Sequence, residues 1–358
     1  MKTPILQSRP LKPNELEPLA ERAVGALLRE GESAHTRASY QGALRYWAAW
    51  FAMRFDQPLD LPVAPSAVLQ FIIDHAEHQS EDGLRTALPA EIDQALVDGG
   101  FKARLGPPAL ATVMHRLAVL SALHEARRAP NPCKDPAVRE LIAKTRKAYA
   151  KRGHRPNKKA ALTREPLEAL LATCNDSLRG RRDRALLLFA WASGGRRRSE
   201  VSAATIENLR RLGPQAYLYT LTHSKTNQSG DDHPENQKPL VGAAAAALEH
   251  WLLASKVKTG PIFRRIRRGD HVAEPLSPSA VRNIVKARCE MAGIEGDFSA
   301  HSLRSGFVTE AGIQNASLGD TMAMTDHRSI QTVLGYFRSG QLMDSPIARL
   351  MDSNKKSD

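Results

Sequence analysis

The chain has 358 residues, of which 51 are Lys or Arg and 38 are Asp or Glu, so its formal net charge is +13. A chain of this length is expected to form two domains. Its 42% hydrophobic and 25% charged content is typical of a globular protein and excludes a disordered one. The basic excess predicts a polyanionic partner, with nucleic acid as the first candidate, and carries no information about the fold.

Cysteine usage and hydropathy narrow the class of protein further. The chain has three cysteines, far apart and without Cys-x-x-Cys spacing: Cys133, Cys174 and Cys289. This pattern excludes a disulfide framework and a thiolate zinc site, and it is typical of a reducing compartment. No apolar run approaches the roughly 18 residues of a membrane span, and residues 1–15 lack the pattern of a signal peptide. We therefore expect a soluble, intracellular protein with no membrane partner.

The first 150 residues are predicted to be helical. Residues 1–15 are polar and rich in Pro, which predicts a flexible arm. Apolar side chains that recur every three or four positions then predict helices at 16–31, 36–55, 66–79, 108–128 and 135–152, with a shorter one at 89–100. Since none of these segments has the alternation of a strand, no strand is expected here.

A basic segment separates the two halves of the chain. Residues 144–159, KTRKAYAKRGHRPNKK, contain eight Lys or Arg and no acidic residue, with Gly153 and Pro156 among them. We expect a linker at 151–160. It is either a solvated tether or, between two DNA-binding domains, a segment that lies along phosphates.

The second half is predicted to be mainly helical with one small antiparallel sheet. Helical spacing is found at 162–174, 181–195, 238–255, 277–293, 299–313, 329–338 and 345–351. The alternating residues 215–226, followed by the turn-forming residues 227–236, predict a strand that continues into a hairpin.

Four local groups of side chains in this half are candidates for chemistry. They are Arg197 with Glu200, Lys225 in the predicted hairpin, His301 with Arg304, and His327 with Tyr336. Glu200 can pair with Arg197 across one helical turn. Three residues separate His301 from Arg304, so both share one helix face and can bind the same anion. Taken singly, each group is better explained without a catalytic role: the cations as a solvated surface, and Tyr336 as a half-buried core residue.

Taken together, the order Arg, Lys, His-x-x-Arg, His, Tyr resembles the tyrosine recombinase (phage integrase) family. The motifs are Arg-x-Ser-Glu at 197–200, His-x-x-Arg at 301–304, and a His and a Tyr nine residues apart at 327 and 336. The resemblance covers the whole second half. The first half is similar to the family's helical core-binding domain, most closely to that of the Cre-like recombinases. The chain departs from the family at Asp326, where a Gly usually precedes the histidine, and in the longer segment 79–106.

The resemblance implies a mainly α fold in the form of a two-domain DNA clamp. An N-terminal helical core-binding domain is joined to a mostly helical catalytic domain with a small antiparallel sheet. The expected ranges are a flexible arm at 1–15, the core-binding domain at 16–150, a basic linker at 151–160 and the catalytic domain at 161–358. An oligomerisation helix is expected at about 345–352.

The resemblance also implies the activity of a site-specific DNA recombinase. Such an enzyme cleaves and rejoins DNA through a 3′-phosphotyrosine intermediate and a Holliday junction, without a metal, another cofactor or ATP. The transition state carries extra negative charge on a five-coordinate phosphorus, so positioning and electrostatic stabilisation must supply most of the acceleration. Arg197 and Arg304 would hold the two non-bridging oxygens, because a planar guanidinium can donate two hydrogen bonds to a phosphate. Tyr336 would attack the phosphorus.

The remaining catalytic roles follow from the same resemblance. Lys225 would protonate the departing 5′ oxygen, and Glu200 would orient the site from behind. His301 would act as a proton acceptor or donate a hydrogen bond to the phosphate, since an ordinary imidazole pKa near 6.5 permits both. His327 would donate a hydrogen bond to the phosphate.

The implied partner is double-stranded DNA with inverted-repeat target sites. The protein is expected to be a monomer in solution and a homo-tetramer on DNA, in the cytoplasm and on the nucleoid, with a bacterial, phage or plasmid gene. The candidate DNA-binding residues are Arg37, Ser39, Thr112, His115, Arg116, Ser279 and Arg282. Among these, Arg282 is suited to read a guanine.

Two further groups of residues have an expected role. The basic group Arg264, Arg265, Arg267 and Arg268 is expected in a loop, either solvated or against the DNA backbone. Ile347, Leu350 and Met351 are expected to be buried in a pocket of a neighbouring subunit, or else against their own subunit.

Two alternative functions stay open. A type IB topoisomerase or a telomere resolvase shares the chemistry, although the Cre-like first half and the tail helix argue against it. A catalytically silent DNA-binding relative is the other alternative, and the presence of all six active-site residue types argues against it.

Overall fold

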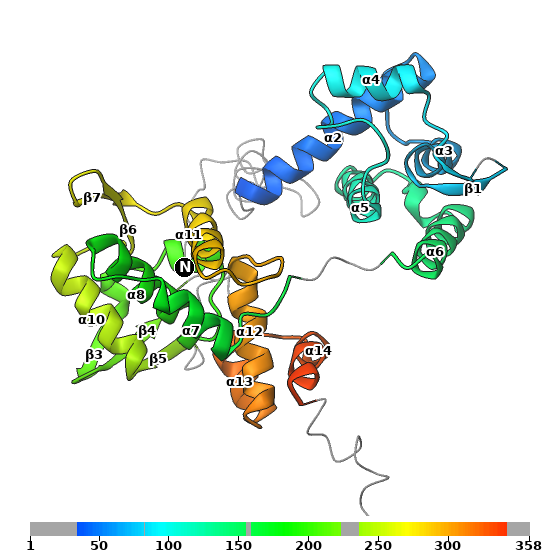
Figure 1. Cartoon of the computed structure of the whole chain (residues 1–358). Helices are drawn as coiled ribbons and strands as arrows, with labels where there is room; N and C mark the ends of the chain where they lie inside the picture. Colours follow the sequence, from blue (N-terminus) through cyan, green and yellow to red (C-terminus); the bar gives the residue numbers. More distant parts are fainter. Residues whose placement is uncertain (1–33, 82, 155–158, 223–235, 342–358) are drawn as a thin grey trace, which may run out of the picture. The chain divides into compact units, whose positions relative to one another are not determined.

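The computed structural model describes residues 34–81, 83–154, 159–222 and 236–341 (Figure 1). The chain divides into two units, Met1–Pro156 and Asn157–Asp358. The predicted mainly α fold with a small antiparallel sheet is confirmed, and the described residues contain three such sheets. The division lies within the expected linker, while helix α6 extends to Lys151, and the wider domain assignment stays a prediction. No helix in the described ranges is long and apolar enough to span a membrane.

The first unit is built from five described α-helices. They are α2 (Ala34–Phe55), α3 (Pro65–His75), α4 (Ala90–Asp98), α5 (Leu110–Ala126) and α6 (Pro136–Lys151). They correspond to the predicted helices at 36–55, 66–79, 89–100, 108–128 and 135–152, although α3 ends at His75, before the predicted end at 79. The helix predicted at 16–31 lies outside the described residues. The start of α6 has a local cause: the Asp135 carboxylate accepts hydrogen bonds from the backbone N–H groups of Ala137 and Val138, and Pro136 occupies the first turn.

The prediction of no strand in the first unit is wrong. A two-stranded antiparallel sheet pairs β1 (His78–Ser80) with β2 (Gly83–Arg85). Each strand has only three residues, mostly polar and partly exposed, so no alternation of apolar residues marks it in the sequence. Helix α3 accordingly ends at His75, and Ala76 is already extended.

Stacked aromatic rings form the core of the first unit. The rings of Trp47 and Phe71 are stacked with centroids 3.8 Å apart, and Trp50 meets both edge-on. The Tyr46 hydroxyl lies 2.7 Å from His75 Nε2, and burial lowers the pKa of His75 to about 3. These contacts join α2 to α3 through buried apolar area, the main source of stability in such a unit.

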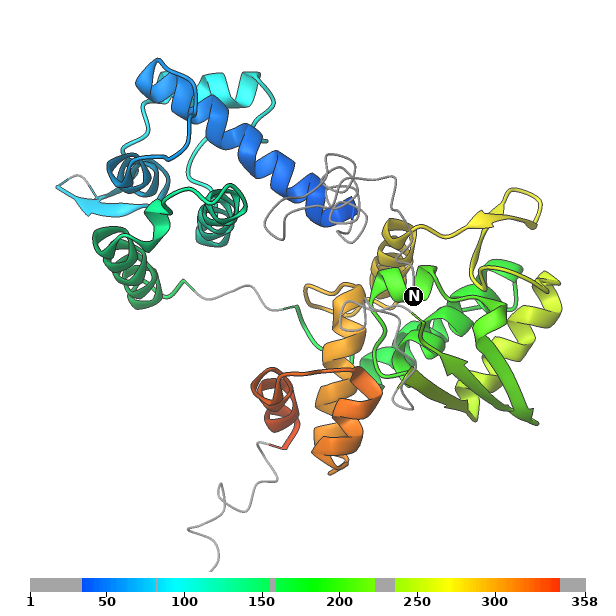
Figure 2. The ribbon, with the colours of Figure 1, turned by 180° about the vertical axis from the view of Figure 1, so that it is seen from behind.

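The second unit combines helices with two small sheets (Figures 1 and 2). Its helices are α7 (Arg164–Ala172), α8 (Leu178–Ala192), α9 (Arg198–Ser202), α10 (Ala243–Ser255), α11 (Pro278–Met291), α12 (Ala300–Ile313), α13 (Leu318–Thr325) and α14 (Ile330–Gln341). Its strands are β3 (Leu209–Gly213), β4 (Ala216–Thr220), β5 (Gln237–Val241), β6 (Arg264–Arg267) and β7 (His271–Pro275). The order β3–β4–β5 is antiparallel throughout, and β6 pairs with β7.

Several sequence predictions for the second unit need correction. The helix predicted from residue 238 begins at Ala243, because Gln237–Val241 forms β5. Lys238 and Leu240 of β5 are both buried, and a buried lysine hides the alternation that would reveal a strand. The arginine-rich segment expected in a loop is mostly strand β6, so this unit has a second sheet. The short helices α9 and α13 were also not predicted.

Candidate active site

The Gly194–Gly195 turn brings two candidate arginines together. It follows α8, and both glycines have positive φ. A Cβ on Gly195 would lie 2.3 Å from Arg304 Cα, and one on Gly194 would lie 2.1 Å from the Met324 carbonyl oxygen. Only glycine therefore lets this turn pass so close to α12 and to the end of α13.

Arg197 and Glu200 form the predicted pair at the start of α9. Glu200 Oε2 accepts a hydrogen bond from the Arg197 backbone N–H at 3.0 Å, and Oε1 accepts one from Arg197 Nη1 at 2.6 Å. Glu200 is buried, whereas the Arg197 side chain is 25% exposed. The carboxylate therefore orients the guanidinium from the protein side and leaves part of it toward solvent.

Arg304 joins three segments of the second unit. It lies on α12, is 2% exposed, and donates hydrogen bonds to the Gly195 carbonyl and to the Thr325 carbonyl. Its Nε lies 3.3 Å from His327 Nε2. Burial, followed by repulsion from Arg197 and Arg196, lowers the pKa of Arg304 to about 9. The side chain is still charged at neutral pH, in a group of like charges that a bound anion would stabilise.

The two candidate histidines are neutral at pH 7. His327 Nδ1 lies 2.7 Å from Thr325 Oγ, and burial together with the nearby Arg304 lowers the pKa of His327 to about 4. His301, in the first turn of α12, has its pKa lowered below 6.5 by desolvation and by Arg304. A neutral imidazole has one donor and one acceptor nitrogen, which suits both roles expected for these residues.

The lowered pKa of His327 predicts a loss of stability in acid. As the pH falls from 6.5 to about 4, His327 of the unfolded chain binds a proton while the folded one does not, so acidification favours unfolding. We expect the wild type to lose roughly 1–2 kcal/mol more than a His327→Gln variant between pH 7.5 and pH 4.5, with partial solvent exposure taken into account. Urea unfolding of both proteins at the two pH values measures this difference, and an equal loss in both would contradict the prediction.

Tyr336 lies on α14, which packs against α12. Its half-buried side chain packs with Val308, Val333 and Phe337. The two helix backbones approach closely, since a Cβ on Gly312 would lie 2.2 Å from the Phe337 carbonyl oxygen. The direct packing of α14 on α12, the helix that carries His301 and Arg304, therefore sets the position of the candidate nucleophile.

Some predicted site residues cannot be placed. Lys225 lies outside the described residues, as do Ile347, Leu350 and Met351. The roles expected for them stay predictions.

The candidate DNA-binding residues of the first unit lie on α2 and α5. Ser39 Oγ and His115 Nε2 are 3.0 Å apart, which joins the two helices, and Arg37 is exposed. Thr112 is half-buried. The Arg116 guanidinium lies 3.2 Å from the centroid of the Tyr46 ring, so it is turned toward the protein interior. Its assignment to DNA stays a prediction that this orientation does not favour.

The candidates of the second unit lie beside a groove of about 630 Å³. Ser279 and Arg282 are exposed on α11, and Ser279 lines the groove together with Arg179 and Arg265. Within β6, Arg265 and Arg267 both contact Glu274 of β7, which partly neutralises the basic group there.

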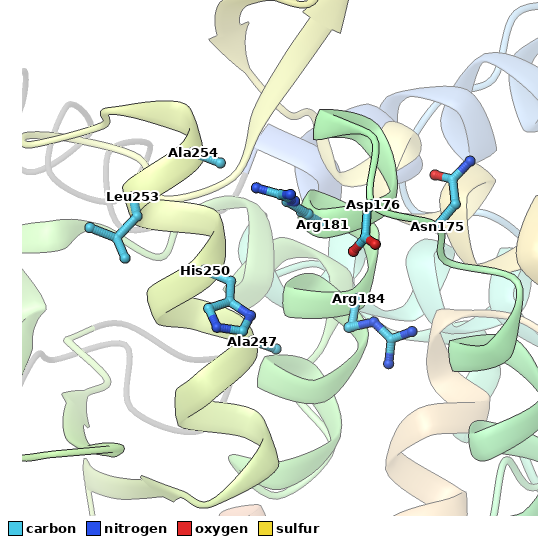
Figure 3. Close-up of a pocket in the computed structure, with 8 residues that line it drawn as sticks. All are labelled: Asn175, Asp176, Arg181, Arg184, Ala247, His250, Leu253 and Ala254. Atoms are coloured by element: carbon cyan, nitrogen blue, oxygen red, sulfur yellow. The ribbon is translucent and has the colours of Figure 1, made fainter.

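A second pocket, of about 520 Å³, lies between α8 and α10 (Figure 3). It is lined by polar side chains such as Arg181 and Arg184 of α8 and His250 of α10. It contains none of the predicted site residues. No group of three His, Cys, Asp or Glu within the described ranges is arranged to hold a metal ion.

Three residues near the site were missed by the sequence predictions. Asp326 is in the left-handed region (φ 54°), with one oxygen 2.5 Å from Arg196 Nη1 and the other 2.6 Å from Lys238 Nζ. Arg196 and Lys238 are both fully buried. The sequence offered one signal for these residues, Asp326 itself. It stands where the resemblance predicts a glycine, which indicates a backbone with positive φ, and few residue types adopt that conformation.

Comparisons with known proteins agree with the family that the motif order indicates. Residues 160–341 match the model of the phage integrase family. An integrase/recombinase xerD homolog from Selenomonas ruminantium is 28% identical over 299 residues, covering 81% of this chain and 78% of the relative. The tyrosine recombinase slr0733 from Synechocystis sp. is 25% identical over 333 residues, covering 90% of this chain and 92% of the relative.

A solved structure shares the fold. The site-specific recombinase XerH bound to a palindromic difH substrate, in a post-cleavage complex, matches with a TM-score of 0.54. The alignment covers 88% of this chain and 80% of that one at 15% identity, a level at which the likeness concerns the fold alone.

Proposed function

This chain belongs to the phage integrase family, the tyrosine recombinases, and on that premise we propose that it cleaves and rejoins DNA at specific sites through a 3′-phosphotyrosine intermediate. The family and the enzyme class indicated by the motif order are thereby confirmed. The closer likeness to Cre-like recombinases stays a prediction.

One observation carries the proposal: buried Arg304 lies between the Gly195 turn, which leads into Arg197, and the His327 segment. Two guanidinium groups and two neutral imidazoles are thus gathered in one region of the catalytic unit. Such a group of donors is suited to the charge that develops on a five-coordinate phosphorus.

The proposed steps distribute the roles as follows. The Tyr336 hydroxyl gives its proton to His301 as its oxygen attacks the phosphorus, and the bond to the 5′ oxygen breaks. Lys225 supplies the proton that the departing 5′ oxygen takes up. Rejoining is the reverse reaction, in which a 5′ hydroxyl displaces the tyrosine. Since the phosphotyrosine bond retains the energy of the broken linkage, ATP is not required. The guanidinium groups of Arg197 and Arg304 take the place of a metal ion in stabilising the charge on the phosphate.

The proposed partner is duplex DNA with inverted repeats, on which the protein assembles into a tetramer. Strand exchange in pairs would then pass through a Holliday junction. The segment containing Ile347, Leu350 and Met351 is proposed to join the subunits. Sedimentation of the protein with a duplex that carries two sites tests the assembly, and a complex that never exceeds a dimer would contradict it.

Selection of covalent complexes from a random duplex library tests the proposed function. The protein is incubated with the library in EDTA and without ATP, adducts resistant to denaturant are recovered, and the attached DNA is sequenced. We expect a tyrosine-linked 3′ end and an enriched inverted repeat, here named the selected duplex.

Other outcomes of the selection point to the alternatives. Binding without any adduct would indicate a silent relative, and adducts without sequence preference would indicate a topoisomerase. Adducts that need a divalent metal would contradict the chemistry proposed.

The packing of α14 on α12 makes a prediction about Gly312. In a Gly312→Ala variant the new Cβ would meet the Phe337 carbonyl, so α14 must move and Tyr336 moves with it. Because a displacement of about 1 Å can cost about 10²-fold in rate, we expect cleavage of the selected duplex to slow by roughly that factor with little change in its Kd.

Gly335→Ala is the matched control for this experiment. It lies on α14 next to Tyr336, and a Cβ there meets nothing within 4 Å. Its single-turnover rate should stay near that of the wild type. Equal rates for both variants would show that the contact at Gly312 does not position Tyr336.

A further inference from the structure

The turn before His327 is held by three basic side chains. Three successive carbonyl oxygens at the end of α13 each accept a hydrogen bond: that of Ala323 from Lys238, that of Met324 from Arg196, and that of Thr325 from Arg304. The last carbonyls of a helix have no partner within the helix and lie at its negative end, so cations are favoured there. The three cations come from β5, the turn after α8, and α12.

Asp326 completes this arrangement. Its side chain lies between Arg196 and Lys238, with both distances near 2.6 Å. Although burial alone would raise the pKa of the Asp326 carboxyl, Arg196 and Lys238 lower it below its usual 3.8, so the group is ionised at neutral pH. Without this carboxylate, two fully buried cations would lose their main counter-charge.

The contacts continue as far as Arg197. Arg196 Nη1 lies 3.7 Å from Glu200 Oε2, and Glu200 Oε1 accepts from Arg197 Nη1 at 2.6 Å. Lys238, Asp326, Arg196, Glu200 and Arg197 therefore form a series of alternating charge, here called the charge series. It connects β5 to the partly exposed arginine proposed to bind phosphate.

We infer that Asp326 and Lys238 are positioning residues that set His327 and Arg197 relative to one another for reaction with DNA. The inference rests on the proposed function. Glycine, which the family usually has at position 326, can adopt the left-handed conformation but has no carboxylate. In this chain the position therefore combines two properties, a tolerated positive φ and an ionic anchor for the turn.

The test separates the carboxylate from the backbone conformation. In Asp326→Gly and Asp326→Asn the φ is permitted and the charge is absent, and Lys238→Met removes the cation on the other side. We expect each to slow single-turnover adduct formation on the selected duplex at least tenfold at saturating protein. The Kd of each variant for the selected duplex, measured by anisotropy, should change less than threefold. Wild-type rates in Asp326→Gly would overturn the inference.

Asp183→Asn is the matched control for loss of stability. Asp183 is also a buried carboxylate between two buried arginines, Arg182 and Arg288, in the same unit, but it has no contact with the His327 turn. Its unfolding temperature should fall as in Asp326→Asn, while its rate at saturation stays within threefold of the wild type. If Asp183→Asn and Asp326→Asn slowed the reaction equally, Asp326 would have only a structural role.

The remaining outcomes separate failure of the positioning role from failure of the proposed function. If Asp326→Asn does not fold, the double variant Lys238→Met/Asp326→Asn leaves Arg196 alone near Glu200, and a wild-type rate in it would overturn the inference. If the wild type forms no adduct with any duplex, the proposed function fails and the inference fails with it. Wild-type activity with unchanged variants refutes only the positioning role.

Discussion

Replacing Tyr336 by phenylalanine is expected to abolish covalent attachment of DNA and to leave the Kd for the selected duplex unchanged. The substitution removes only the hydroxyl oxygen, the proposed nucleophile, and keeps the ring that packs with Val308, Val333 and Phe337. Since a nucleophile has no substitute, adduct formation should fall at least about 10³-fold. Denaturing gels of labelled duplex measure the adduct, and anisotropy measures binding.

Tyr217→Phe serves as the control for the Tyr336 experiment. Tyr217 lies on β4 of the same unit and belongs to its hydrophobic core. This variant should form adduct like the wild type. A tyrosine-linked 3′ adduct formed by Tyr336→Phe would exclude Tyr336 as the nucleophile.

Replacing Arg304 by lysine is the second substitution with a large expected effect. Lysine keeps the charge, but it cannot donate at once to the Gly195 carbonyl, the Thr325 carbonyl and a phosphate, because it lacks the planar fork of donors. We expect the single-turnover rate at saturating protein to fall by about 10²–10³-fold, the usual effect of removing one donor to a transition state.

The Arg304 experiment has its own control in Arg288. Arg288 is likewise buried and donates to the Thr173 carbonyl and to Asp183, away from the proposed site. Arg288→Lys should lower the unfolding temperature while the rate at saturation stays near that of the wild type. If Arg304→Lys cleaves within threefold of the wild type, the role proposed for Arg304 in binding the phosphate is wrong.

Helices in which apolar residues recur over several turns were predictable from the sequence. In α2, Tyr46, Trp47 and Trp50 recur on the buried face, and α6 begins at an Asp–Pro pair that marks a helix start. The elements that were missed are short or have a charged residue at a buried position. Strands of three residues and helices of five to eight have too few periods to be recognised.

The candidate site was predictable only in part, because its contacts differ in sequence separation. Glu200 lies three residues from Arg197, so helical geometry alone predicts that they meet. Arg304 meets Gly195 and His327 across 109 and 23 residues, and no local pattern reports such a contact. The inward direction of Arg116 likewise depends on Tyr46, which is 70 positions away in sequence.

The family, the mainly helical class and the residue types available for phosphoryl transfer follow from the sequence, because they depend on the local spacing of residues and on the order of motifs. Contacts between distant segments set which cations are buried and what each of them binds. Lys238 and Arg196 appear in the sequence as two of 51 basic residues, yet both are fully buried against Asp326. A buried charge is stable only beside a counter-charge. Here the counter-charge is Asp326, which is 88 residues from Lys238 and 130 residues from Arg196 in the sequence, and the fold brings the three together.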